Sequence, residues 1–179
     1  MTTLALYEDL LRPGEVRALA AASRILFVAS GTASSLGPDE AWSGDADARL
    51  DAGREGATVL RWEVTDWEPD GAKAAERVEL DPWSDYVMRC ERVELAPGSS
   101  PATQAGPSVG CVLAGALRSE DEEGRGLSVL DAWSEGAHAG RTAASDLGAT
   151  LVRVVLLPAD SGPADGEQAI VLAEQRVRL

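Results

Sequence analysis

The sequence predicts an all-β protein of the sandwich or jelly-roll type, built from two copies of one unit. Two observations lead to this prediction. Short runs rich in Val, Ile, Leu and Trp are separated by Gly, Pro, Asp and Ser, which is typical of strands joined by turns. In addition, three short segments each occur twice and in the same order along the chain, which indicates an internal duplication.

The duplication rests on three pairs of similar segments, separated by 84, 91 and 92 residues. The pairs are LRPG at 11–14 with LAPG at 95–98, EAWS at 40–43 with DAWS at 131–134, and GATVLR at 56–61 with GATLVR at 148–153. We therefore expect two halves, 1–70 and 85–179, joined by a connector at 71–84. Gly31 should correspond to Gly115, and Arg61 to Arg153.

Each predicted strand follows from its local composition. The clearest are 87–95, 108–117 and 149–157; a further strand is expected at 24–31, and a last one within 169–179. Residues 14–23 are rich in alanine, but the corresponding segment contains Pro101 and Pro107, which a helix interior does not accept. We therefore expect residues 14–23 to be extended or irregular. Within the connector, the alanines of residues 71–77 would allow a short helix.

Composition excludes several classes of protein. The 179-residue chain has a net charge of −14 and no cluster of Arg and Lys with interleaved aromatics, which argues against nucleic-acid binding. Its apolar runs are far shorter than the ~20 residues of a membrane span. The N-terminus lacks the basic region of a signal peptide, so a cytoplasmic location is expected. Cys90 and Cys111 form no CxxC motif and are expected to be buried apolar side chains.

Two segments of the second half carry a family resemblance. P97-G98 followed by SVGCVLAG at 108–115 resembles the first cupin motif, which has a PG turn, an HxH pair, a glutamate and a strand ending in glycine. LDAWSEGAH at 130–138 resembles the second cupin motif. Residues 85–158 are similar to a group of bacterial cupin proteins, and the first half is a weaker copy. The resemblance implies a double-stranded β-helix, or jelly-roll β-barrel, in each half, and hence a bicupin.

The residues that hold a metal in cupins are missing from this sequence. The resemblance places the HxH pair at Ala102 and Gln104 and the glutamate at Ser108. The same positions of the first half hold Ala18, Ala20 and Arg24. The last histidine position is Ala139, one residue after the only histidine, His138. Cupin metals need a set of imidazoles and a carboxylate, so we expect neither a metal nor another cofactor.

Strand alternation would point Ser108, Gly110 and Val112 into the barrel, with Gln104 also facing inward. Gln104 and Ser108 would then be hydrogen-bonding groups of a ligand-binding lumen, with Gly110 leaving space. A barrel filled by side chains is the alternative, and it is favoured for each residue taken singly.

Two further pairs of residues are candidates for ligand binding, namely Trp42 with Trp133 and Arg61 with Arg153. Each tryptophan could stack on a ligand, and each arginine could bind an anion inside the barrel. Because both types occur in both halves, a structural role is favoured. The tryptophans would then plug the barrel ends, and the arginines would pair with acids across a subunit interface or between the halves.

His138 could act as a general base at the barrel mouth, oriented by Glu135 or by Asp131. The polar segment SEGAHAGR around it favours a solvated loop histidine instead.

The function predicted first is a metal-free cupin-like protein that binds a small apolar or weakly acidic molecule in a barrel lumen. A metal-independent lyase, isomerase or cyclase that uses acid–base catalysis is the alternative, and a structural protein with a filled barrel is the second alternative. Because residues 87–95 are apolar on both faces, we also expect a homodimer.

Overall fold

The computed structural model describes residues 2–81, 83–102, 105–119, 126–136, 142–161 and 169–177. Within these residues the chain forms twelve strands and no helix, which confirms the all-β prediction. The strands are β1 (Thr2–Leu11), β2 (Val16–Leu19), β3 (Arg24–Ala33), β4 (Ala41–Gly44), β5 (Ala48–Thr65), β6 (Ala74–Val78), β7 (Tyr86–Leu95), β8 (Ser108–Ser119), β9 (Gly126–Leu127), β10 (Ala132–Glu135), β11 (Thr142–Pro158) and β12 (Ala169–Val177).

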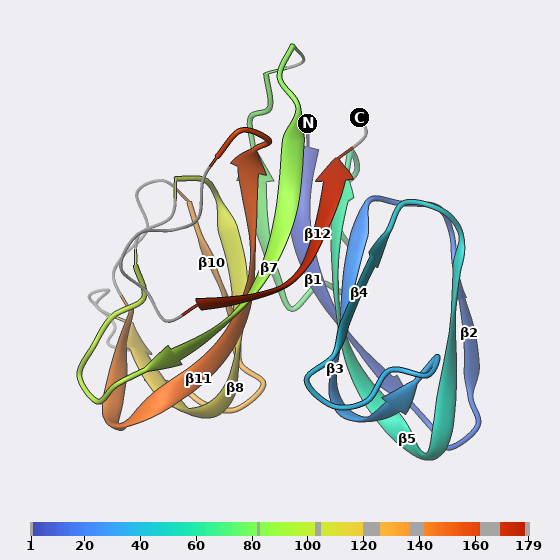
Figure 1. The fold of residues 1–179 in the computed structure, drawn as a ribbon, viewed down its shortest axis with the longest axis horizontal. Coiled ribbons are helices and arrows are strands. Elements are labelled where there is room, and N and C mark those ends of the chain that lie inside the picture. The colour runs from blue at the N-terminus through green and yellow to red at the C-terminus, as the bar shows by residue number, and fades with distance from the viewer. Residues whose placement is uncertain are drawn as a thin grey trace.

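The strands form two antiparallel sheets with the same order. The N-terminal half has the order β4-β3-β5-β1-β6, with β2 paired to β5. The C-terminal half has the order β10-β8-β11-β7-β12, with β9 paired to β8. The two halves lie side by side, and both chain termini lie at the same end of the molecule (Figure 1). The boundaries 1–70, 71–84 and 85–179 stay a prediction.

One strand lies inside the predicted connector. β6 pairs with β1 in an antiparallel ladder that runs from Leu6 opposite Ala74 to Thr2 opposite Val78. The short helix considered for residues 71–77 is therefore wrong, because the open edge of β1 supplies a partner that alanine content does not reveal. Residues 14–23 contain β2 and are extended, as predicted.

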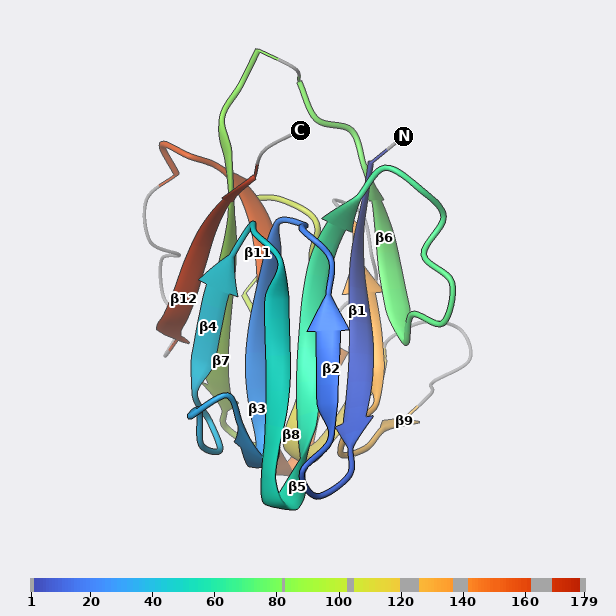
Figure 2. The ribbon, with the colours of Figure 1, turned by 90° about the vertical axis from the view of Figure 1, so that its right-hand side faces the viewer.

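The long strand β5 gives the N-terminal half two layers. Its residues 57–65 pair with β1. Its residues 57–63, together with Ala52, pair with β3, whereas its residues 48–51 pair with β2. As a result, β2 lies on the outer side of the half, in front of the main sheet in Figure 2. The interior between these layers is the place where a barrel lumen would lie.

Four glycines fix the sharp bends of the two halves. Gly31 and Gly115 have φ values of +73° and +75°, and Gly56 and Gly148 have values of +78° and +79°. A Cβ at Gly31 would overlap the carbonyl oxygen of Gly56, and a Cβ at Gly115 would overlap that of Gly148. Only glycine satisfies both the left-handed backbone and the close approach. The predicted repeats thus share the same backbone constraint at matching positions.

The largest core lies between the two sheets. On β5 the side chains of Leu60, Trp62 and Val64 face this core, which also includes Met88 and Cys90 of the C-terminal half. Its other members come from β1, β3, β6, β8 and β11. Apolar surface buried from both sheets at once joins the halves into one folded unit.

Each half also has its own core on the opposite side of its sheet. Val28, Leu50 and Val59 belong to the one in the N-terminal half, and Val93 and Leu95 to the one in the C-terminal half. β7 therefore buries both of its faces within one chain. A second subunit is therefore not needed to cover the apolar faces of β7, and the homodimer stays a prediction.

Cys90 and Cys111 are buried and free, in agreement with their predicted packing role. No helix among the described residues is long and apolar enough to cross a membrane.

Candidate functional site

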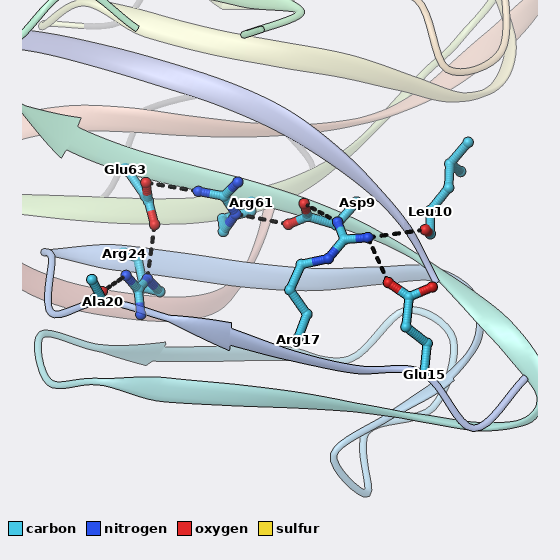
Figure 3. A network of polar contacts seen from close by, with 8 residues as sticks. All are labelled: Asp9, Leu10, Glu15, Arg17, Ala20, Arg24, Arg61 and Glu63. Atoms are coloured by element: carbon cyan, nitrogen blue, oxygen red, sulfur yellow. Dashed lines mark hydrogen bonds and ion pairs between the residues drawn. The ribbon is translucent and has the colours of Figure 1, made fainter. Parts of the chain in front are cut away.

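The interior of the N-terminal half contains a continuous network of ion pairs (Figure 3). Asp9 on β1 accepts from Arg17 on β2 at 2.8 Å and from Arg61 on β5 at 2.7 Å. Arg61 also donates to Glu63 at 2.7 Å, and Glu63 accepts from Arg24 on β3 at 3.0 Å. The network ties four strands together and balances three guanidinium groups against acidic side chains.

Two groups extend this network. The Arg61 guanidinium lies 4.2 Å from the centre of the Tyr7 ring. Burial, and after it the negative charge of Glu63, raise the pKa of Tyr7 above its usual value. Arg24 donates to the carbonyl oxygen of Ala20.

The residues at the cupin metal positions do not fit a metal ion in the N-terminal half. The buried guanidinium of Arg24 stands where cupins have a glutamate, and Ala18 and Ala20 offer no side-chain ligand. The nearby carboxylates, Asp9 and Glu63, each accept from two arginines. Positive charge at this point opposes a cation. The described part of the chain contains no group of three or more His, Cys, Asp or Glu side chains able to hold a metal.

A smaller ion pair occupies the interior of the C-terminal half. Arg153 donates from Nε and from Nη2 to the same oxygen of Glu91, at 3.0 and 2.9 Å, and from Nη1 to the carbonyl of Ala102 at 3.3 Å. Both Arg61 and Arg153 thus pair with acids of their own half. The expectation that they pair between the halves is wrong, because strand alternation directs them away from the shared core.

The other predicted site residues do not form a cavity in the described residues. Ser108 is buried and lies opposite Glu135 across the β8–β10 pair. The space expected at Gly110 is filled, because a Cβ there would overlap the Trp133 indole. Gln104 and His138 lie outside the described residues.

Trp133 packs against the core of the C-terminal half. Its indole Nε1 is buried and has no hydrogen-bond partner among the described residues. A Cβ at Gly110 would overlap its ring, so the indole lies over the neighbouring strand.

A pocket of about 380 Å³ opens in the N-terminal half instead. Its wall consists of Leu26, Ser34, Ser35, Leu36, Trp42, Asp47, Ala48 and Arg49. Trp42 comes from β4 and Leu26 from β3, where the two residues are direct cross-strand partners. Only Trp42 was a candidate from sequence, since the remaining lining residues belong mainly to a loop and to a strand start with no periodic signal.

The polar part of this pocket is a tight turn next to an arginine. Ser34 and Ser35 have φ values of +49° and +69°, which non-glycine residues rarely adopt. The Ser34 hydroxyl donates to the carbonyl of Arg49 at 2.7 Å and accepts from the amide of Asp51 at 3.1 Å, which holds the turn in place. The Arg49 guanidinium donates from Nε to Asp51 at 2.7 Å and is 65% exposed. It can therefore still approach an acidic group at the pocket mouth.

A second pocket of about 320 Å³ lies in the C-terminal half, lined by Val87, Arg89, Ala159, Glu174 and Arg176. Arg89 donates to Glu174 at 2.7 Å and to the carbonyl of Ser161 at 3.4 Å. With one large apolar side chain and an arginine already engaged, this pocket fits an organic ligand less well than the first.

Comparison with known proteins identifies the fold of the chain. No family model and no curated protein matches the sequence. Among solved structures, a cupin 2 conserved barrel domain protein from Leptotrichia buccalis is similar with a TM-score of 0.53 and 12% identity, covering 86% of this chain and 84% of that one. AerE from Microcystis aeruginosa has a TM-score of 0.59 and 14% identity, covering 87% and 88%.

A salicylate 1,2-dioxygenase from Pseudaminobacter salicylatoxidans is also similar, with a TM-score of 0.59 and 11% identity, covering 86% of this chain and 70% of that one. At identities this low, the similarity supports a conclusion about the fold only. Together with the two antiparallel sheets and the absence of helix from the described residues, these similarities show that the chain has the cupin fold.

Proposed function

We propose that this cupin-fold protein binds a small apolar or weakly acidic molecule in the pocket of the N-terminal half, without a metal ion. The observation that carries the proposal is the pocket itself. Its volume of about 380 Å³ lies at the lower end of the range of small-molecule sites, ~300–1,000 Å³. Trp42 is 38% exposed there, so one face of an indole is available to a ligand.

The chemistry of the wall selects the kind of ligand. Leu26, Leu36 and Trp42 offer apolar surface suited to a ring or a short hydrocarbon chain. Arg49 offers a guanidinium at the mouth, which suits one carboxylate or phenolate. Asp47, on the same rim, opposes a ligand with several negative charges. A monocarboxylic acid with one ring satisfies all of these groups.

Binding is favoured over catalysis by the titratable groups of the wall. Asp47 and Arg49 are the ionisable members of this lining, and an arginine does not exchange protons near neutral pH. General acid–base catalysis by the wall would therefore depend on a single carboxylate. One fold relative is named for salicylate, a small aromatic acid, which makes benzoate and salicylate reasonable first probes.

Calorimetric titration with benzoate, salicylate and the neutral analogue benzamide, in buffer containing EDTA, tests the proposal. Trp42→Ala should weaken benzoate binding by about tenfold or more, which corresponds to ~1.4 kcal/mol or more. Trp83→Ala is the matched control, because Trp83 is 93% exposed and does not line the pocket, and it should bind as the wild type does. Arg49→Gln should reduce the preference for benzoate over benzamide.

Three results would overturn the proposal. These are no binding of any of the three probes, equal binding by the Trp42→Ala and Trp83→Ala variants, or binding that appears only when a divalent metal is added.

A further inference from the structure

Trp42 and Trp133 occupy matching positions but differ in their surroundings. In each half the tryptophan lies directly opposite one residue of the neighbouring strand, Leu26 for Trp42 and Gly110 for Trp133. Leu26 and Gly110 correspond to each other, being separated by the 84 residues that relate the halves at this strand. The tryptophan is thus repeated, whereas its cross-strand partner is not.

The two indoles lie in different directions. A Cβ added at Gly110 would overlap the Trp133 ring, so this ring lies across the neighbouring strand. A Cβ added at Gly44 would overlap the Trp42 ring, so that ring lies along its own strand, two residues onward. The residue of the C-terminal half that corresponds to Gly44 is Glu135, 91 positions later. Each ring therefore rests on a glycine, and the glycine is in a different place in each half.

We infer that the exchange of these glycines determines the direction of each indole, so that Trp42 lines the ligand pocket of the N-terminal half whereas Trp133 packs on its own sheet. The ligand part of this inference rests on the proposed function. Leu26 and Gly44 direct Trp42 to the pocket, and Gly110 with Glu135 directs Trp133 onto the sheet.

Packing supports this assignment. Leu26 belongs to the core of the N-terminal half and occupies the surface on which the Trp42 ring would otherwise lie. The indole consequently stays partly exposed and lines the pocket together with Leu26. Trp133 instead packs against the core of the C-terminal half. A flat ring that lies on a strand glycine removes both its own face and the glycine backbone from water. This contact is favourable where no side chain lies between the ring and the strand.

Neither glycine is required by backbone conformation. Gly44 and Gly110 have no left-handed φ, in contrast to Gly31 and Gly115. A side chain at either position is therefore opposed by the indole and not by the backbone. The two residue pairs can accordingly be exchanged by mutation to test their effect on ring direction.

The experiment uses two reciprocal variants of the whole chain. Leu26→Gly/Gly44→Glu should turn the Trp42 ring onto the sheet and close the pocket. Gly110→Leu/Glu135→Gly should turn the Trp133 ring off the sheet and expose it, and should leave the N-terminal pocket unchanged. Incorporation of 5-fluorotryptophan reports both rings by ¹⁹F NMR, and titration with benzoate reports the state of the N-terminal pocket. The resonances are assigned with the single variants Trp42→Phe and Trp133→Phe.

We expect the first variant to lose benzoate binding by about tenfold or more. The second should bind benzoate as the wild type does, because it leaves Trp42, Leu26 and Gly44 in place. The Trp42 resonance should lose its solvent-induced shift in the first variant, and the Trp133 resonance should gain one in the second. If the first variant does not fold, the second decides alone.

Unchanged ring resonances in a folded variant would overturn the inference, as would wild-type affinity for benzoate in a folded Leu26→Gly/Gly44→Glu variant. Ring shifts in the expected direction without any benzoate binding by the wild type would support the ring assignment and refute the proposed function. The two failures are therefore distinguishable.

Discussion

Replacing Glu91 by Gln should destabilise the protein strongly, because it removes the charge that balances a buried guanidinium. Arg153 is 1% exposed and Glu91 is also 1% exposed, and two nitrogens of the arginine donate to one oxygen of the carboxylate. Removal of the acidic partner from such a pair leaves the buried cation without this countercharge in a medium of low polarity, which costs ~3–5 kcal/mol. Gln keeps the size of the side chain, so the loss is assigned to charge.

Urea unfolding followed by circular dichroism measures this loss. With a slope of ~2 kcal/mol per molar urea, a loss of ~3 kcal/mol lowers the midpoint by ~1.5 M. The matched control is Asp51→Asn, which breaks the ion pair between Arg49 and Asp51, whose side chains are 65% and 49% exposed. Pairs this exposed contribute ~0–1 kcal/mol.

A double variant separates charge from packing. Arg153→Met with Glu91→Leu removes both charges and keeps apolar volume, so it should regain most of the stability that Glu91→Gln loses. The reasoning would be refuted if Glu91→Gln lost no more than Asp51→Asn, or if the double variant were less stable than Glu91→Gln.

Three further predictions use the same urea assay. Gly14→Ala should lower the free energy of unfolding by ~1–2 kcal/mol, because Gly14 has a φ of +70° but open space around it. Gly31→Ala should lower it by clearly more, because a Cβ there also overlaps the backbone, and equal losses would contradict this. Burial raises the pKa of Cys111 from 9.0 to about 12. The thiol therefore ionises at lower pH in the unfolded protein than in the folded one, and the free energy of unfolding should fall as pH rises from 9.0 toward 12. A Cys111→Ala variant should show a smaller fall. Trp62→Phe should cost ~2–4 kcal/mol, because it removes the 2.9 Å bond to the carbonyl of Val109 and ring volume between the halves; a loss below ~1 kcal/mol would contradict the role of this contact.

The all-β fold could be predicted because its main signals are local. Apolar runs broken by Gly and Pro mark the strands, and the repeated PG and GAT segments mark equivalent bends. Gly31 and Gly115 were matched from sequence, and the structure gives them the same left-handed backbone and the same close approach. β6 was missed because a short polar strand acquires its identity from the edge of β1, a partner that lies far away in the chain.

The candidate site was less accessible from sequence for a different reason. Arg61 was recognised, but its carboxylate partner depends on which residue β1 places beside it, and strand register is not a local property. The pocket was missed because Ser34 and Leu36 lie in a loop whose conformation no periodic pattern encodes. The two tryptophans were treated as equivalent, whereas their neighbours, Leu26 and Gly110, make them different.

Binding of a small acid in the N-terminal pocket without a metal is tested most directly by NMR titration of ¹⁵N-labelled protein with benzoate in the presence of EDTA. We expect shift changes to concentrate at the Trp42 indole N–H and at the amides of Ser34, Ser35 and Arg49, and to saturate at one benzoate per chain. Changes centred on the C-terminal half, or changes that arise only after a divalent metal is added in place of EDTA, would contradict the account.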